Sequence, residues 1–414
     1  MEIPESIDKA HISDYLERMY YGNVQLFYEH KNQIVKYDAV LIDEIQDYHR
    51  SWMEIIKNFF RDPKGDYVLF GDVKQNIYGQ PTLQKDVVTN VRGVNELKYC
   101  FRSDFKVRDL AQSFQQNVFG DKYDTDDFSE NGSYDFFGQQ QQKEGYINYM
   151  YLQDKNNIAS LYTIIRGNIL NKAGNISPND ITILGYTTGL LRTFDAYYRY
   201  ASREKTNSML ETIETMYMTH LNYIGKNNGG NPNLAWFNNI TEHFKKKLFP
   251  KRTTLYDYDL IKLRQHIAVL FTIYDLYVSF PDTFKERLIE ECEKCRINFD
   301  VLIAFRKHYE EVLTQFKKEV YSSNYKNIRD NKKLHFWMNS GTIKISTINS
   351  FKGWESEVVF LVLEPKYDKS TTFNLSFDEL LYTGIIRCKR NLIVINFGNE
   401  EYDIKIRPLI AKLK

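Results

Sequence analysis

The stretch Val40-Leu41-Ile42-Asp43-Glu44-Ile45-Gln46-Asp47 joins a short apolar run to two adjacent carboxylates. The apolar run begins at Tyr37, and a run of this length bounded by polar residues is typical of a strand. We therefore expect a strand over residues 37–43 that ends at the acidic pair. Because ligands of open parallel sheets bind beyond the carboxyl ends of the strands, this pair is a candidate site.

A second strand is predicted shortly afterwards. Apolar spacing predicts a helix around residues 52–60, and a turn at 63–65 leads into the run YVLFGD, which ends at Asp72. The order strand, helix, strand, with an acidic residue at each strand end, indicates an α/β fold.

The rest of the chain alternates between strand and helix patterns. Strands are predicted at 147–152, 180–186, 342–348, 357–363 and 391–397. Residues 121–143 are polar and irregular, which predicts a surface loop. Residues 191–339 have mostly helical spacing and are interpreted as a helical insertion subdomain. We expect four segments: 1–95, 96–190, 191–339 and 340–414, the last completing the sheet begun in the second.

Composition restricts the class of protein. The 414 residues are 43% hydrophobic and 26% charged with a formal net charge of +1, which is typical of a globular protein of two or three domains. A nucleic-acid surface would therefore need local basic patches. Apolar runs are too short to span a membrane and no signal peptide is evident, so we expect a cytoplasmic protein. Cys292 and Cys295 form a CxxC without a second pair, which favours ordinary helix cysteines over a zinc site.

The two acidic strand ends suit nucleotide hydrolysis. Asp43 can hold Mg²⁺, directly or through water, while Glu44 can orient and deprotonate an attacking water. In the second cluster, Gln75 can sense a γ-phosphate. Each segment alone is equally compatible with a plain acidic turn after a strand.

In order and spacing, DEIQD (43–47) and GDVKQNIYG (71–79) resemble motifs II and III of UvrD/Rep-like superfamily 1 DNA helicases. The resemblance implies two RecA-like P-loop NTPase lobes, the first truncated and the second carrying the helical insertion. It implies ATP and Mg²⁺ as cofactors, single-stranded or partially duplex DNA as partner, and a DNA contact at Tyr78.

Further motifs extend the resemblance. Residues 97–114 resemble motif IV, in which Phe101 would stack on adenine and Arg102 would reach the γ-phosphate; a surface arginine at a helix start is the alternative for Arg102. Residues 378–396 resemble motif VI and match its arginine with Arg387. Arginine suits both positions because it stays charged and can stabilise charge on the transferred phosphoryl group.

Residues 343–364 resemble motif V, whose polar turn contacts the DNA backbone and whose glutamate approaches the nucleotide sugar. Glu355 matches that glutamate. The turn residues that would bind DNA are Thr347, Asn349, Ser350 and Lys352. A softer similarity, at 206–218, is to UvrD-like proteins that carry a nuclease-related domain.

The chain also departs from the family pattern. The phosphate-binding loop G-x-x-x-x-G-K-[ST], or Walker A motif, does not occur in the 414 residues, and Gly225-Lys226 lacks the hydroxyl residue and reads as a flexible loop. Gln80 and Pro81 replace a tryptophan and an arginine expected near DNA bases. Asn349 replaces a histidine and Ile386 a threonine, so we expect the coupling between DNA and ATP to differ from that of the family.

A basic run with interleaved aromatics is a second candidate for DNA contact. It comprises Lys245, Lys246, Lys247, Lys251 and Arg252, with Phe244 and Phe249 between them. Charge and stacking together can hold a nucleic-acid strand. A solvated helix end before Pro250 is the favoured alternative, since charge runs are usually surface.

Two functions follow as expectations. The first is the C-terminal motor portion of an ATP-dependent DNA helicase or translocase in repair or defence, inactive in hydrolysis until an upstream or separate segment supplies Walker A. The second is an ATPase-dead DNA-binding or protein-interaction scaffold. The complete set of γ-phosphate residues favours the first, and the missing phosphate loop favours the second.

Overall fold

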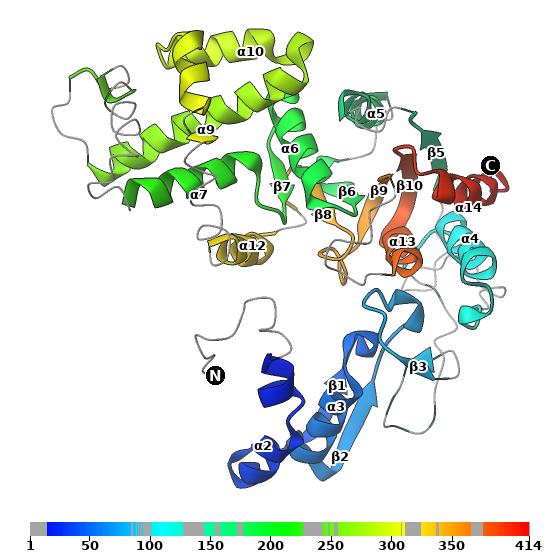
Figure 1. Ribbon diagram of the computed structural model, residues 1–414. Coiled ribbons are helices and arrows are strands. Elements are labelled where there is room, and N and C mark those ends of the chain that lie inside the picture. Colours follow the sequence, from blue (N-terminus) through cyan, green and yellow to red (C-terminus); the bar gives the residue numbers. More distant parts are fainter. Residues whose placement is uncertain are drawn as a thin grey trace. The chain divides into compact units, whose positions relative to one another are not determined.

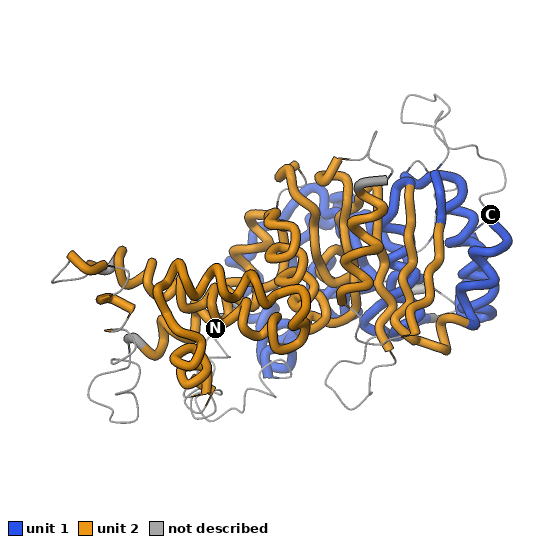
Figure 2. The backbone as a smooth tube through the Cα atoms, turned by 90° about the horizontal axis from the view of Figure 1, so that it is seen from above, with its two compact units in different colours: residues 1–147, 366–390, 404–414 blue, residues 148–365, 391–403 orange. Residues whose placement is uncertain are grey.

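A computed structural model describes most of the chain (Figure 1). The described residues are 15–83, 86–87, 89, 91, 93, 100, 102–126, 145–153, 158–171, 177–226, 242, 244–246, 249–251, 256–307, 309–310, 324–336, 339–365 and 376–413. They form two compact units, coloured separately in Figure 2. Unit 1 comprises residues 1–147, 366–390 and 404–414, and unit 2 comprises 148–365 and 391–403.

Unit 1 contains the predicted strand, helix and strand. Strand β1 (Tyr37–Ile42) pairs in parallel with β2 (Arg61–Leu69), and helix α3 (Arg50–Ile55) connects them. Ile42 and Met53 are buried between this sheet and α3. The predicted turn at 63–65 instead lies inside β2. Tyr37 pairs with Arg61 and Ala39 pairs with Asp66, so β2 has extra residues between these two pairs and the pairing is irregular there.

Unit 1 contains further elements besides α13 (Phe377–Ile386). They are α2 (Val24–Glu29), the hairpin of β3 (Thr82–Leu83) and β4 (Asp86–Val87), α4 (Phe105–Phe114) and most of α14 (Glu400–Ala411). Helix α4 packs against α13, burying apolar residues at the helical spacing 107, 110, 111 and 114. The predicted surface loop begins differently, since the aromatic side chain of Tyr123 is buried beside α13.

Unit 2 contains most of a six-stranded sheet, in the order β5 (Ile147–Tyr151), β10 (Cys388–Asn396), β9 (Ser356–Leu363), β6 (Ile181–Gly185), β8 (Ile343–Thr347) and β7 (Thr206–Ser208). Strand β6 runs parallel to β8 and β9, and β7 runs parallel to β8. The five predicted strands are confirmed, as is the α/β class with a parallel sheet. Almost every residue of β6, β8 and β9 is buried, as expected of parallel strands covered on both faces.

Helices account for the rest of unit 2. They are α5 (Ile158–Asn171), α6 (Thr188–Ser202), α7 (Ile213–Lys226), α9 (Asp257–Ser279), α10 (Pro281–Lys294) and α12 (Asn324–Leu334). Helices α7, α9 and α10 share a core that contains Phe271, Cys292 and Cys295. The helices described between residues 191 and 339 agree with the predicted helical spacing there, whereas β7 belongs to the sheet. None of the described helices is both long and apolar enough to cross a membrane.

Short 3-10 or π turns complete the secondary structure. They span Glu17–Tyr21, Lys31–Gln33, Ile45–Asp47, Ile56–Phe60, Val73–Gln75, Gln115–Phe119, Gly120–Lys122 and Pro178–Asp180. Two of them, at 45–47 and 73–75, directly follow the acidic ends of β1 and β2.

Candidate functional site

The acidic pair lies at the carboxyl end of β1, as predicted. The Asp43 carboxylate is exposed and its Oδ1 accepts a hydrogen bond of 2.8 Å from the backbone N–H of Glu44. Glu44 has a left-handed backbone, with φ 55° and ψ 43°. A non-glycine residue in this region is uncommon and often marks a constrained functional turn. The turn therefore presents two carboxylates from consecutive residues with a fixed backbone between them.

Gln46 joins the ends of β1 and β2. Its side-chain amide donates a hydrogen bond to the Glu44 carboxylate, and its Oε1 accepts one of 3.1 Å from the backbone N–H of Asp72. Gly71 permits this approach, because a Cβ at that position would lie 2.6 Å from Gln46 Oε1 and 2.6 Å from Ile45 Cγ1. The two acidic turns are thus held together by one buried carboxamide and one glycine.

Asp72 orients Gln75. The Asp72 carboxylate caps the following turn, accepting 2.9 Å from the backbone N–H of Lys74 and 3.1 Å from Nε2 of Gln75. Burial raises the pKa of Asp72, although Lys74 and the hydrogen bond from Gln75 oppose this rise. Since the Gln75 nitrogen donates to Asp72, its oxygen is directed away from Asp72 and is available as an acceptor.

The acceptor oxygen of Gln75 meets Arg387. Arg387 is 2% exposed and follows the last residue of α13, and its Nη2 donates a hydrogen bond of 2.6 Å to Gln75 Oε1. Helix α13 also packs against the turn that carries Gln75. Because the acceptor is a neutral amide and not a carboxylate, this contact orients the guanidinium without neutralising its charge. The structure therefore brings together the predicted glutamine of motif III and the predicted arginine of motif VI.

The two residues that follow Arg102 form hydrogen bonds with the two residues that follow Arg387. The Ser103 hydroxyl donates 2.9 Å to the carbonyl of Cys388, and the Asp104 N–H donates 2.6 Å to the carbonyl of Lys389. The Arg102 side chain itself is exposed. Phe101 lies outside the described residues. The backbones that carry Arg102 and Arg387 are therefore adjacent.

The acidic turn fits Mg²⁺ only as part of a nucleotide complex. The described residues include no group of three or more His, Cys, Asp or Glu side chains that can hold a metal ion. Mg²⁺ in nucleotide sites typically takes one or two protein carboxylates and completes its octahedron with phosphate oxygens and water. The exposed carboxylate of Asp43 suits that arrangement.

The predicted DNA-binding turn belongs to unit 2. Thr347 ends the buried strand β8, and its Oγ1 accepts 3.2 Å from the N–H of Ser350. Asn349, Ser350 and Lys352 are partly exposed, and Phe351 between them is fully buried and anchors the turn. Glu355 is half-buried in the same segment, and Tyr78 of unit 1 is 43% exposed.

Glu364 occupies the start of helix α6. Its Oε1 accepts 2.9 Å from the N–H of Tyr186 and 2.7 Å from the N–H of Thr187, and the Thr187 hydroxyl donates to Oε2. Burial raises the pKa of Glu364, whereas these hydrogen bonds oppose the rise. The signal in the sequence was an acidic residue directly after the apolar run of β9, and its capping role could not be read from that signal.

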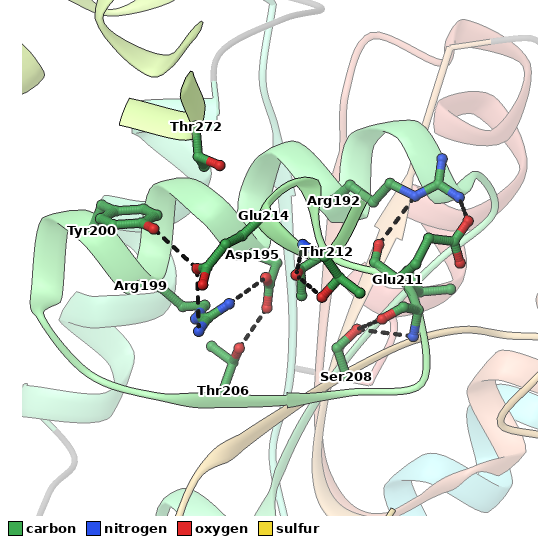
Figure 3. A network of polar contacts seen from close by, with 12 residues as sticks. Arg192, Asp195, Arg199, Tyr200, Thr206, Ser208, Glu211, Thr212, Glu214 and Thr272 are labelled. Atoms are coloured by element: carbon green, nitrogen blue, oxygen red, sulfur yellow. Dashed lines mark hydrogen bonds and ion pairs between the residues drawn. The ribbon is translucent and has the colours of Figure 1, made fainter. Parts of the chain in front are cut away.

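A dense polar network joins α6, β7 and the start of α7 in unit 2 (Figure 3). Buried Asp195 accepts a hydrogen bond from Thr206, and Glu214 accepts one of 3.0 Å from Tyr200. Glu211, 2% exposed, pairs with Arg192 and, at 2.7 Å, with Arg329 of α12. None of the predicted site residues belongs to this network, whose charges pair with one another.

The basic run does not combine charge with free aromatic faces. Phe244 is 1% exposed in the helical core, and Phe249 packs against the same core. Lys245 pairs with Glu242 at 3.3 Å. Lys247 and Arg252 lie outside the described residues. The interpretation that Phe244 stacks on bases is therefore wrong, because its ring is buried in the helical core.

Sequence reasoning missed three residues beside the candidate site. Lys74, buried between Asp72 and Gln75, donates 2.8 Å from Nζ to Asp126 Oδ1, and Asp126 Oδ2 accepts 2.7 Å from Nε2 of Gln115. Lys74 stands inside the quoted motif and could have been noted. Asp126 is 52 residues from Lys74, and Gln115 is 11 residues from Asp126. No local pattern in the sequence marks either residue.

No protein-family model matches this sequence, and no curated protein matches it with significant similarity.

Proposed function

We propose that this chain is the C-terminal motor portion of an ATP-dependent DNA helicase or translocase that acts on single-stranded DNA. The observation that carries the proposal is the 2.6 Å hydrogen bond between Gln75 and Arg387, with Gln75 fixed by Asp72. A glutamine that contacts the phosphate and an arginine that stabilises charge on it must lie side by side. The resemblance implies this task for both residues independently of their contact.

The roles follow from the chemistry of each side chain. Asp43 positions Mg²⁺ and Glu44 orients and deprotonates the attacking water. Gln75 senses the γ-phosphate, and Arg102 with Arg387 stabilises the charge that develops on it. Phe101 stacks on adenine and Glu355 approaches the ribose, as the resemblance implies. Hydrolysis then drives movement along DNA.

The DNA contacts in this proposal come from two segments, the turn after β8 and the residue Tyr78. Thr347, Asn349, Ser350 and Lys352 hold the phosphate backbone, and Tyr78 contacts the strand. Hydroxyl, amide and ammonium groups of this kind bind phosphate without reading sequence. The proposal therefore predicts binding that depends on salt and little on base sequence.

The phosphate loop comes from an upstream or separate segment in this proposal. The outer face of β1 and β2 supports such an addition, because Tyr37, Leu41, Val68 and Phe70 on it are each at least 40% exposed. Parallel strands are normally covered on both faces. A further α/β layer that carries G-x-x-x-x-G-K-[ST] would cover these side chains and cradle the phosphates.

The second candidate is a DNA-binding or interaction scaffold that does not hydrolyse ATP. ATP hydrolysis distinguishes the two. The chain alone should show no DNA-stimulated ATPase, and adding the loop-bearing segment should produce it. Glu44→Gln should then abolish hydrolysis, while Glu54→Gln, at an exposed pair with Arg50, should not. DNA binding with no hydrolysis in the completed protein would support the scaffold.

A further inference from the structure

The turn that carries Gln75 is attached to α13 by a second route. Lys74 precedes Gln75, is buried, and its ammonium lies 2.8 Å from the Asp126 carboxylate. An ammonium in such a place needs an anionic partner, because burying an unpaired charge is costly. Lys74 therefore cannot leave Asp126 without cost, and Gln75 cannot shift without moving Lys74.

Asp126 is held in turn by α4 and the turn after it. Nε2 of Gln115 donates 2.7 Å to Asp126 Oδ2, and Oε1 of Gln115 accepts 2.8 Å from the Asp126 N–H. Gln112 adds a hydrogen bond of 3.0 Å to the Asp126 carbonyl. The carboxylate, the N–H and the carbonyl of Asp126 are all engaged, so its position is closely determined.

Gln115 completes the connection to α13. Gln115 is 2% exposed, and its Nε2 also donates 2.8 Å to the hydroxyl of Tyr382, a buried residue of α13. Arg387 follows the last residue of the same helix. A closed circuit therefore runs from Arg387 to Gln75, along the chain to Lys74, through Asp126 and Gln115 to Tyr382, and along α13 back to Arg387.

We propose that Asp126 is a positioning residue that fixes the Gln75–Arg387 pair by tying Lys74 to helix α13 through Gln115. The inference rests on the proposed function for its catalytic meaning, but the geometry that it predicts can be measured without hydrolysis. Asp126 touches neither reacting group, and it acts by holding the distance between the two residues that would contact the γ-phosphate.

The first measurement uses the full chain and an arginine-selective reagent, phenylglyoxal, with peptide mass spectrometry. Asp126→Asn keeps the shape of the side chain but removes the charge that pairs with Lys74. Loss of the anionic partner of the buried Lys74 ammonium should open the circuit locally and raise the modification rate of Arg387 by about tenfold or more. Arg192 of unit 2 reports on general unfolding and should keep its rate.

Two further variants test the route. Asp121→Asn removes an exposed carboxylate of the same segment and should leave Arg387 as protected as in the wild type. Lys74→Met should raise the Arg387 rate as Asp126→Asn does, and the double variant should exceed neither single variant, since both act through one contact. Unchanged protection of Arg387 in Asp126→Asn, or equal exposure of Arg192, overturns the proposal.

The catalytic consequence is measured in the protein completed with the loop-bearing segment. Asp126→Asn should lower kcat by roughly tenfold to a hundredfold with little change in KM for ATP, because Gln75 and Arg387 act on the transition state. A rise in KM with kcat unchanged overturns the positioning role. If the completed wild-type protein hydrolyses no ATP, the proposed function fails, and the Arg387 protection still decides whether Asp126 positions the pair.

Discussion

The side-chain oxygen of Gln75 accepts a hydrogen bond of 2.6 Å from Arg387, a residue 312 positions further along the chain. Both groups are nearly buried, and the amide is oriented by its second hydrogen bond, to Asp72. A contact that joins a strand-end turn to a helix end over such a separation constrains both segments. Loss of this contact should therefore lower the free energy of unfolding by a measurable amount.

Gln75→Leu should destabilise unit 1. The substitution removes an acceptor of the buried Arg387 and a donor to the Asp72 carboxylate, at a cost of about 2–4 kcal/mol in the free energy of unfolding. Urea denaturation followed by circular dichroism measures the change. Gln33→Leu, at an exposed position, is the matched control and should shift stability by less than about 0.5 kcal/mol. Equal effects of the two variants would contradict the assignment.

Lys352→Ala should weaken binding to single-stranded DNA. If Lys352 contacts one phosphate, its loss should lower the affinity several-fold and reduce the slope of log K against log salt by about 0.7. Fluorescence anisotropy with an oligothymidylate at several salt concentrations measures both. Lys285→Ala, at an exposed position of α10, should change neither. A lower affinity with the same salt slope would argue against a phosphate contact.

His220 should make the helical core sensitive to acid. Burial lowers the pKa of His220 to about 4, and its Nδ1 lies 2.6 Å from the hydroxyl of Tyr309. Between pH 6.5 and 4 the unfolded chain binds the proton more readily, so stability falls as the pH falls through this window. The loss at pH 4 should approach about 3 kcal/mol.

The acid effect is isolated by comparing His220→Gln with wild type. The stability difference between them should change over pH 4 to 6.5, whereas His335→Gln, at an exposed position, should give a difference that is constant with pH. Thermal unfolding at several pH values provides the data. A pH-independent difference for His220→Gln would show that the imidazole is not held neutral.

Glu211 should stabilise unit 2 mainly through Arg192. Burial raises the pKa of Glu211, but hydrogen bonds and charges from Arg329 and Arg192 lower it below its usual value overall. The Arg192 side chain is 18% exposed and that of Arg329 is 46% exposed (Figure 3 shows the Arg192 pair). Charge pairs gain more when water is excluded.

Arg192→Met should therefore cost about 3 kcal/mol and Arg329→Met about 1 kcal/mol in the free energy of unfolding. Arg203→Met, in an exposed pair with Glu290, is the control and should cost less than either. The reverse order of the first two variants would show that burial does not determine the strength of these pairs. Because the pKa of Glu211 is lowered, its contribution should be complete above about pH 4.5 and disappear in stronger acid.

The cysteines should react unequally in the native protein. Burial raises the pKa of Cys295 to about 12, and burial also raises that of Cys292, so little thiolate is present at neutral pH. Cys100 is half-buried and Cys388 is buried. Only Cys100 should react quickly with a disulfide reagent at pH 7.5, and all four should react in denaturant. Rapid native labelling of Cys292 or Cys295 would contradict their place in the core.

The strand ends could be predicted because their signal is local. An apolar run followed by Asp43 or Asp72 identifies both the strand and the edge at which ligands bind. The irregular pairing in β2 could not be predicted from the sequence, because it depends on how many residues the partner strand β1 supplies. The contact of Asp126 with Lys74 could not be predicted either. The two residues are distant in sequence, and no local pattern marks Asp126 as the partner of a buried lysine.

Aromatic residues were the least predictable part of the candidate sites. Phe244 among lysines looks like a stacking platform, yet its ring is buried with the helical core. Tyr123, in a stretch otherwise typical of a loop, donates a hydrogen bond of 2.6 Å to Glu379 at the start of α13. Local composition describes the charges around such rings, whereas burial is decided by which helix packs against them.

Glu364 places a buried carboxyl group at the carboxyl edge of the sheet in unit 2. The first N–H groups of a helix at the carboxyl edge of a parallel sheet are the place where α/β proteins commonly receive a phosphate. Here the chain's own carboxylate already accepts the hydrogen bonds of Tyr186 and Thr187. A phosphate at this edge would compete with that carboxylate for the two N–H groups that directly precede α6.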